Sequence, residues 1–233
     1  AGLNRPFLPN SNALQAIRLN SALTNGNAFS GTAFADIKLH RDLTATVNIG
    51  TNLDEARSNT VTNPFYGQFA GTGRVVVGHQ RTYEVNAQQM RNYNHTFGTQ
   101  HRFSAMIGHE FYNLKSYTLS GAKQNMFSID NNELTGAVED TQNAASYTTE
   151  YNNEGYFGRV EYEYDNRIVL NGSYRRDASS RFHPDHRWGN FWSLGAAWLI
   201  TRESCFNASW VNMLKVKASY GSQGNDTLGS KAE

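Results

Sequence analysis

Residues 167–200 read RIVLNGSYRRDASSRFHPDHRWGNFWSLGAAWLI, and residues 214–225 read LKVKASYGSQGN. These stretches contain three runs in which apolar and polar residues alternate with a period of two. Successive side chains of a β-strand point to opposite sides of a sheet, so each run predicts a strand with one apolar and one polar face. The predicted apolar faces are Ile168, Leu170, Gly172 and Tyr174 in the first run; Trp192, Leu194, Ala196, Trp198 and Ile200 in the second; and Leu214, Val216, Ala218 and Tyr220 in the third. Such runs, ending in aromatics, glycine or charges, are typical of transmembrane β-barrels.

The composition fits a membrane barrel better than a helical membrane protein. The chain has 233 residues, of which 39% are hydrophobic and 18% charged, and it contains 12 Tyr, 13 Phe and 4 Trp. A transmembrane helix needs about 18 or more apolar residues in a row, and the sequence has no such run. The net charge of +1 indicates no nucleic-acid partner. The single cysteine, Cys205, excludes an internal disulfide.

Turn signals between the alternating runs predict about eight strands. We expect four antiparallel pairs: 29–39 with 43–52, 83–97 with 101–117, 147–164 with 167–176, and 188–200 with 213–222. Short links at 40–42, 98–100 and 165–166 alternate with long ones at 53–82, 118–146 and 177–187, and the connection 201–212 is expected to contain a short helical turn. Outer-membrane barrels place short turns on the periplasmic side, so the long segments are predicted to be extracellular. The expected fold is all-β: one domain over residues 1–233, forming an open curved sheet that is part of an antiparallel transmembrane β-barrel.

Three phrases in the C-terminal third carry a family resemblance: SYRRDASSRF, RWGNFWSLGAAW and LKVKASYGSQGN, in this order. They are similar to the SusC/RagA-type family of TonB-dependent outer-membrane transporters. Weaker similarity extends upstream to NYNHTFGTQHRFSAMIGHEFY at 92–112 and to GTAFADIKLHRDLTATVNIG at 31–50. Such transporters have a barrel of roughly 22 strands that can hold a plug. The resemblance therefore implies that the chain is an internal piece of a barrel, without the TonB box, the plug domain and the other strands. The lack of a secretory signal at its start agrees with this interpretation.

The resemblance also implies a function and a set of partners. We expect active import of glycans or peptides across the outer membrane of a Gram-negative bacterium, energised by a TonB complex and aided by a SusD-like lipoprotein. The expected partners are therefore outer-membrane lipid, that lipoprotein, the TonB complex and a glycan or peptide substrate, with no nucleic acid. No cofactor and no enzymatic activity are expected.

Substrate contacts are predicted in the long loops, because loops at the mouth of a barrel meet a ligand first. The candidate ligand-binding residues are Phe65, Tyr66, Phe69, Tyr83, Phe127, Tyr147, Asp177 and Arg181. For Asp177 and Arg181, a structural role where the strand leads into the loop is an equal alternative. The residues Tyr174, Trp192, Trp198 and Tyr220 fall on apolar faces, so they predict an aromatic girdle at the membrane interface rather than a sugar-stacking platform.

Other chemistry finds little support in the sequence. The glycine-rich stretch 71–78 has neither the P-loop nor the dinucleotide-binding spacing. The pair His183 and His186 is a weak metal motif outside a helix. The pair Glu161 and Glu163 shares one strand face but has no nucleophile or histidine beside it. We therefore predict no catalytic, cofactor or metal site.

Two other classes of protein remain open. About eight strands could close into a passive porin or a small structural barrel, and alternating strands also build soluble β-sandwich binding modules. A sandwich would bury the face that carries Trp192 and Trp198 against a second sheet. A piece of an importer would leave that face bare on a single open sheet. An outer-membrane enzyme is a fourth possibility, for which no catalytic constellation is found.

Overall fold

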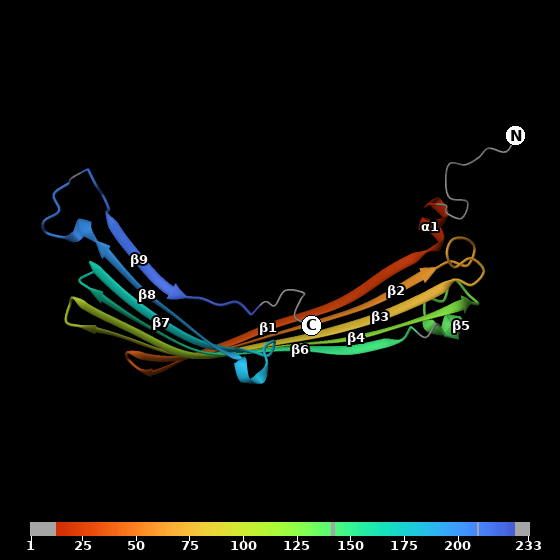
Figure 1. Ribbon diagram of the computed structural model, residues 1–233, viewed down its shortest axis with the longest axis horizontal. Helices are drawn as coiled ribbons and strands as arrows, with labels where there is room; N and C mark the ends of the chain where they lie inside the picture. The colour runs from red at the N-terminus through yellow and green to blue at the C-terminus, as the bar shows by residue number, and fades with distance from the viewer. Residues whose placement is uncertain (1–12, 141–142, 209, 227–233) are drawn as a thin grey trace. The chain divides into compact units, whose positions relative to one another are not determined.

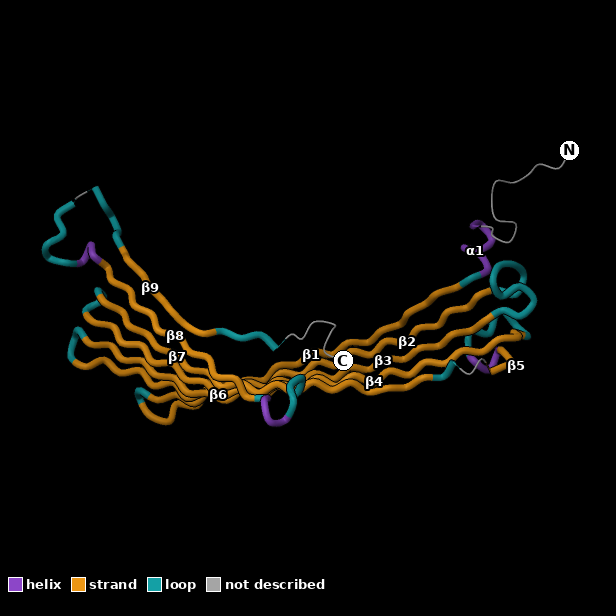
Figure 2. The backbone as a smooth tube through the Cα atoms, viewed as in Figure 1, coloured by secondary structure: helices purple, strands orange, loops and turns teal. Residues whose placement is uncertain are grey.

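The computed structural model describes residues 13–140, 143–208 and 210–226, and β-strands dominate it (Figures 1 and 2). The strands are β1 (Ser21–His40), β2 (Leu43–Thr62), β3 (Arg74–Phe97), β4 (His101–Met126), β5 (Ala137–Asp140), β6 (Ala145–Tyr164), β7 (Ile168–Ser179), β8 (Trp188–Leu199) and β9 (Lys215–Ser222). The helical segments are short: α1 (Ala13–Leu19) and the 3-10 turns η1 (Leu134–Gly136), η2 (Pro184–His186) and η3 (Ile200–Arg202). Within the described residues, no helix has the length and apolar character needed to cross a membrane.

The strands form one open antiparallel sheet in the order β1-β2-β3-β4-β6-β7-β8-β9, with the short β5 paired to β4. Neighbours in this order are also neighbours along the chain, apart from β5, so the topology is a meander of hairpins. The strands β1 and β9 end the order. The predicted all-β class, the antiparallel pairing and the open sheet are confirmed, and eight strands in the main path match the predicted number.

Tight turns join the strands at the predicted short links. Residues 41–42, 98–100 and 165–167 link the two strands within the hairpins β1-β2, β3-β4 and β6-β7. Asp165 and Asn166 have φ angles of 50° and 53°, the left-handed geometry that a type I′ hairpin turn requires and that Asn and Asp tolerate. Residues 200–202 form η3, which lies at the start of the connection where a helical turn was expected.

The strands are longer than the sequence pattern predicted. The segments 53–82 and 118–146 were expected to be loops, but β2 continues to Thr62, β3 begins at Arg74 and β4 reaches Met126. In the barrel that the sequence predicts, a membrane crossing would take only about 9–11 strand residues. Beyond it, polar residues such as those in DEARSNT can occupy both faces while the backbone keeps its hydrogen bonds, so the alternation disappears although the strand does not. The long connections are instead residues 63–73, the segment with η1 and β5, and residues 180–187.

The residues separate into two compact units, which are described one at a time. Unit 1 comprises the described residues up to 30 together with 52–83 and 115–150. Its small core is built from Val61, Val75 and Ala137, which are 2%, 0% and 4% exposed. The amide of Asn59 donates to the carbonyl oxygen of Asn132 at 2.9 Å. This bond ties the segment before η1 to strand β2.

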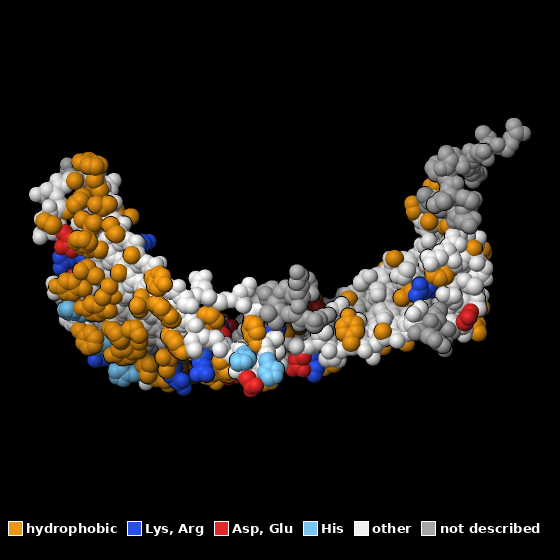
Figure 3. Space-filling model, in the orientation of Figure 1, with side chains coloured by type: hydrophobic (Ala, Val, Ile, Leu, Met, Phe, Trp, Pro, Cys, Tyr) orange, Lys and Arg blue, Asp and Glu red, His pale blue; other side chains and the backbone are white. Residues whose placement is uncertain are grey.

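Unit 2 comprises residues 31–51, 84–114 and the described part of 151–233. Its strands β6 to β9 alternate as predicted, and one face is apolar and bare: Trp192, Leu194 and Trp198 are 42%, 61% and 46% exposed. Hydrophobic side chains gather over these strands at the left of Figure 3. No second sheet covers this face within the described residues. This is the arrangement expected for a barrel wall and not for a β-sandwich.

Candidate functional site

The face of unit 2 opposite the bare apolar one carries a cluster of charged and polar side chains. The Arg175 Nε donates to both carboxylate oxygens of Asp177 at 2.7 Å, and the Arg175 guanidinium also contacts Glu110 at 3.5 Å. Glu110 accepts from the Gln88 amide at 3.1 Å. The guanidinium lies 5.3 Å from the ring centroid of Phe157. These five residues, the wall cluster, give β3, β4, β6 and β7 a fixed charge pattern on the polar face.

Strand periodicity and two glycines place this cluster. Arg175 and Asp177 are two residues apart on β7, so their side chains share a face. At Gly155 an added Cβ would meet the side chains of Asp177 and Arg175, and at Gly108 it would meet the ring of Phe157. Glycine at these two positions therefore leaves the room that the wall cluster occupies.

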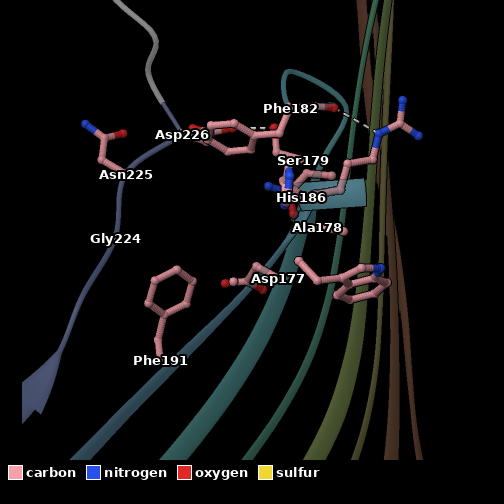
Figure 4. A pocket seen from close by; sticks show the side chains of 13 residues that line it. Asp177, Ala178, Ser179, Phe182, His186, Phe191, Gly224, Asn225 and Asp226 are labelled. Carbon is pink, nitrogen blue, oxygen red and sulfur yellow. Dashed lines mark hydrogen bonds between the residues drawn. The ribbon is translucent and has the colours of Figure 1, made fainter. Parts of the chain in front are cut away.

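A hollow of about 370 Å³ lies beside the wall cluster, between the 180–187 connection and the segment after β9. Phe182 and Phe191 provide apolar lining, and Asp177, Ser179 and Asp226 provide polar lining. Figure 4 shows Phe191, Asp177 and Asp226 around this space, with Ser179 bonded to Asp226. The mixture of aromatic rings and carboxylates could hold a polar ligand group against an apolar surface.

Two residues that line the hollow, Ser179 and Asp226, form with Tyr151 and Arg181 what we call the loop latch. The Asp226 carboxylate accepts from the Tyr151 hydroxyl at 2.6 Å and from the Ser179 hydroxyl at 2.9 Å. The Arg181 Nη1 lies 3.6 Å from the Asp226 carboxylate, and the guanidinium lies 4.5 Å from the Tyr151 ring centroid. The latch therefore joins β6, the end of β7, the following loop and the segment after β9.

The same contacts determine the charge of Asp226. The hydrogen bond from Tyr151 lowers the pKa of Asp226 most, and Ser179 and Arg181 lower it further against the opposing effect of partial burial. Asp226 is therefore ionised at neutral pH, and its hydrogen bonds are charge-assisted, the stronger kind.

The structure brings two of the predicted ligand-binding residues, Asp177 and Arg181, to this site. Each already has an intramolecular partner, because Asp177 pairs with Arg175 and Arg181 with Asp226. These contacts support the structural alternative for both residues, which help to hold the strand ends and the loop. A role in substrate binding stays a prediction.

The predicted aromatic ligand-binding residues lie in unit 1. Phe65, Tyr66 and Phe69 lie in the 63–73 connection, and Phe127 directly follows β4. Phe65 and Phe127 are exposed. The Tyr66 hydroxyl is buried and has no hydrogen-bond partner among the described residues. The Arg74 guanidinium lies over the Phe69 ring, 5.3 Å from its centroid.

Two of these aromatic residues are not in loops, contrary to the prediction. Tyr83 lies within β3 and Tyr147 within β6, because the strands extend past the predicted boundaries. The Tyr83 ring packs edge-on against Tyr117 at 6.3 Å. Tyr147 shares a shallow groove of unit 1 with Tyr117 and His79. The structure thus gathers Tyr83 and Tyr147 around Tyr117, a residue that the sequence did not single out.

The sequence also did not single out Glu110, Gln88, Tyr151 and Asp226. Glu110 could have been found, since it alternates with the apolar residues Ile107 and Phe111 and so falls on the opposite face of the strand. Asp226 carries no comparable signal, because it lies after the last alternating run. Its partners come from segments 47 and 75 residues away in the chain.

The weaker motifs have ordinary structural partners. Glu161 accepts from Arg159 at 2.7 Å, and Glu163 accepts from Arg102 at 2.9 Å. His183 lies 3.5 Å from the exposed Asp185. Within the part of the chain that the structure describes, no group of three or more His, Cys, Asp or Glu side chains could hold a metal ion.

Comparisons with known proteins agree with one another. No family model matches the chain. The chain is 25% identical to TonB-dependent receptor P39 of Formosa agariphila over 223 residues, 89% of this chain and 20% of that protein. It is 28% identical to TonB-dependent receptor SusC of Bacteroides thetaiotaomicron over 229 residues, 95% of this chain and 22% of that protein. The chain thus spans about a fifth of the length of the curated relatives that it matches.

A solved structure shares the fold. The RagAB peptide transporter matches with a TM-score of 0.85 and 21% identity over 91% of this chain and 24% of the other. This match covers β-strands of both units, and the sequence relatives above are all named as TonB-dependent receptors. Over most of its length the chain is therefore similar in sequence to TonB-dependent receptors, SusC among them, and shares its fold with the RagAB transporter.

Proposed function

We propose that the chain forms part of the barrel wall of an outer-membrane importer, which takes up glycans or peptides with energy supplied through TonB. The observation that carries this proposal is the division of the sheet in unit 2 into a bare apolar face and a polar face with the wall cluster. Such a sheet separates lipid from a wet lumen. The relation to TonB-dependent receptors favours an energised importer over a passive porin.

The spacing of aromatic residues on the apolar face supports an outer-membrane location. Trp188 and Trp198 lie ten positions apart on β8, which corresponds to about 33 Å along a strand at roughly 3.3 Å per residue. Strands tilted by about 45° would span roughly 23 Å of membrane over this length, close to the apolar band of about 25 Å in outer-membrane barrels. Tyr174 and Trp192 are cross-strand partners, and Trp192 contacts Tyr220 at 5.7 Å. Trp192 lies four positions from Trp188, about 13 Å along the strand, so these rings extend the aromatic layer inward from the Trp188 interface.

The extracellular end is where we propose that substrate and a SusD-like lipoprotein bind. The exposed rings of Phe65 and Phe127 would offer stacking surfaces there. The hollow beside the loop latch offers a second contact, with Phe182 and Phe191 next to Asp177. In this proposal the barrel does no covalent chemistry, and the energy for release into the periplasm comes from the TonB complex.

Energised uptake can be tested in the organism that carries the gene. We expect deletion of the gene to abolish growth on one class of polymer, oligosaccharide or peptide, supplied as the sole carbon source. Uptake of a labelled oligomer of that class should return with a plasmid copy and stop within minutes of adding a protonophore. Continued uptake after the proton gradient has collapsed would indicate a passive porin. Normal uptake in the deletion strain would contradict the import function.

A further inference from the structure

The hollow of about 370 Å³ in unit 2 has an aromatic side (Figure 4). Phe191 on β8 and Phe182 in the 180–187 connection both line it, and both are half-buried. The Phe191 ring lies against Gly189 and Gly224, where an added Cβ would meet ring atoms. Within the described residues, neither phenylalanine ring has an aromatic or cationic partner. The two rings are therefore available to a ligand that offers an apolar surface.

The polar part of the lining is rich in hydrogen-bond acceptors. Both carboxylate oxygens of Asp177 accept from the same N–H, the Arg175 Nε, so each oxygen can accept a further bond. The Asn153 amide nitrogen donates to the Tyr151 hydroxyl at 3.3 Å, while its amide oxygen has no partner within the described residues. Both hydroxyl contacts of Asp226 go to Oδ2, which leaves Oδ1 able to accept. A ligand that matches this lining must supply donors.

Charges of both signs surround the hollow, and together they disfavour a charged ligand. An anion would face the carboxylates of Asp177 and Asp226, which both line the hollow. A cation would face Arg187, which also lines it, and the guanidinium groups of Arg175 and Arg181, which pair with the two carboxylates. Like charges repel one another. The hollow therefore favours an uncharged ligand that carries several donors and an apolar face.

We propose that the hollow binds a sugar unit of a neutral oligosaccharide, with its C–H face against Phe191 and its hydroxyl groups donating to Asp177 and Asn153. The inference rests on the import function proposed above and narrows its substrate class from glycans or peptides to neutral glycans. A sugar ring combines an apolar C–H face with hydroxyl donors around its edge. The volume lies near the lower end of the range of about 300–1,000 Å³ for small-molecule sites, which suits a short part of an oligomer.

Two other classes of substrate match the lining less well. A uronic acid unit would bring its carboxylate beside Asp177 and Asp226. An extended peptide carries one carbonyl acceptor for each backbone N–H donor, so many of its polar groups would meet acceptors. An acceptor left unsatisfied in a site that excludes water costs free energy.

The test uses the full natural polypeptide that contains this chain, purified in a polyoxyethylene detergent, which has no sugar headgroup. Its binding is measured to arrays of neutral hexasaccharides built from glucose, galactose, mannose or xylose, of uronic acid hexasaccharides and of hexapeptides. We expect binding to at least one neutral hexasaccharide and weaker or undetectable binding to the other two classes. Binding to no neutral hexasaccharide would overturn the inference, as would stronger binding of a uronic acid hexasaccharide or a hexapeptide.

The aromatic contact is tested by replacing one ring at a time. Phe191→Leu keeps an apolar side chain but removes the ring, so the affinity for the bound hexasaccharide should fall by about twofold to tenfold. Phe182→Leu should also weaken binding, and this residue lies outside the sheet. The matched control is Phe111→Leu on the apolar face of β4, which should bind as the parent does. Unchanged affinity in both hollow variants, or an equal loss in the control, would overturn the inference.

The acceptor contact is tested at Asn153. Asn153→Ala removes one acceptor from the hollow, while Tyr151 keeps its hydrogen bond to Asp226, so the affinity should fall by about twofold to tenfold. The matched control is Asn171→Ala, because the Asn171 amide lies against Gly195 on the same polar face and does not line the hollow. Equal affinities of the two variants would overturn the assigned contact between the sugar and Asn153.

Failure of this inference and failure of the proposed function give separate results. A receptor that binds a neutral oligosaccharide, but whose uptake continues after a protonophore is added, would overturn energised import and keep the inference. A receptor with protonophore-sensitive uptake of peptides and no binding of oligosaccharides would overturn only the inference.

Discussion

Asp226 shows how one carboxylate can fix the geometry of a loop. It lies after β9, yet its oxygens hold hydroxyl groups from β6 and β7 through Tyr151 and Ser179. Because charge-assisted hydrogen bonds are stronger than neutral ones, the latch should limit the motion of the 180–187 connection. We expect the hollow between the two segments to keep its shape only while these contacts are made.

The latch predicts a change in protease sensitivity. Asp226→Asn removes the charge that binds Arg181 and weakens both hydroxyl contacts, so we expect cleavage in the 180–187 connection to become several times faster in the full receptor. Limited proteolysis followed by mass spectrometry of the fragments measures this rate. The matched control is Asp185→Asn, since Asp185 lies in the same connection and is exposed. Equal cleavage rates for the two variants would show that the latch does not restrain the loop.

The latch also predicts a dependence on pH with a definite sign. The pKa of Asp226 is lowered from its ordinary value of 3.8, so its stabilising contribution is present above that value and is lost as the pH falls through the lowered pKa. We expect no change in loop cleavage between neutral pH and about pH 5, and faster cleavage under more acidic conditions, as measured with an acid-active protease.

Tyr151→Phe tests the assignment of this acid transition. The Tyr151 hydroxyl is the largest cause of the lowered pKa of Asp226, so removing it should move the onset of fast cleavage to higher pH, toward the ordinary aspartate range. An onset at the same pH in Tyr151→Phe and in the parent would mean that another carboxylate controls the transition.

At the scale of single strands, the sequence predicted the part of each strand that we propose crosses the membrane. In β7 and β8, apolar residues such as Leu170 and Leu194 alternate with polar ones, the pattern expected where lipid and water lie on opposite sides. This constraint ends outside the membrane, so the extension of β2 to Thr62 and of β4 to Met126 left no periodic signal. The residues of the site also divide into those that the sequence pattern predicted and those that it did not. Asp177 was found in a strand-end phrase, whereas the 65-residue separation of Arg175 from Glu110 is bridged by strand register alone.

The apolar face of β8 predicts a strong difference between two arginine substitutions. Leu194→Arg places a charge in the apolar band and should cost about 2–4 kcal/mol in the free energy of unfolding from a bilayer. Ser219→Arg on the polar side of β9 should cost much less, because that face is wet in a barrel. Urea titration of the full receptor in lipid vesicles measures both values. Similar costs for the two variants would show that the faces are not lipid-facing and lumen-facing.

At the scale of the whole molecule, the open order of strands has a physical consequence. The edges of β1 and β9 present backbone groups that the described sheet does not pair, and exposed strand edges associate with other chains. The outer side chains of β9, including Val216 and Tyr220, are exposed as well. A sheet with free edges and a bare apolar face has two separate reasons to self-associate in water.

The isolated 233-residue chain should therefore aggregate without detergent and remain dispersed only when detergent covers its apolar face. Size-exclusion chromatography with light scattering, run with and without detergent above its micellar concentration, distinguishes these states. The same chain carrying Leu194→Gln and Val216→Gln should aggregate less in water, because the substitutions remove exposed apolar area while the strand edges stay. A monodisperse monomer in detergent-free buffer would mean that the apolar face is covered in solution, and would favour a soluble β-sandwich over a barrel wall.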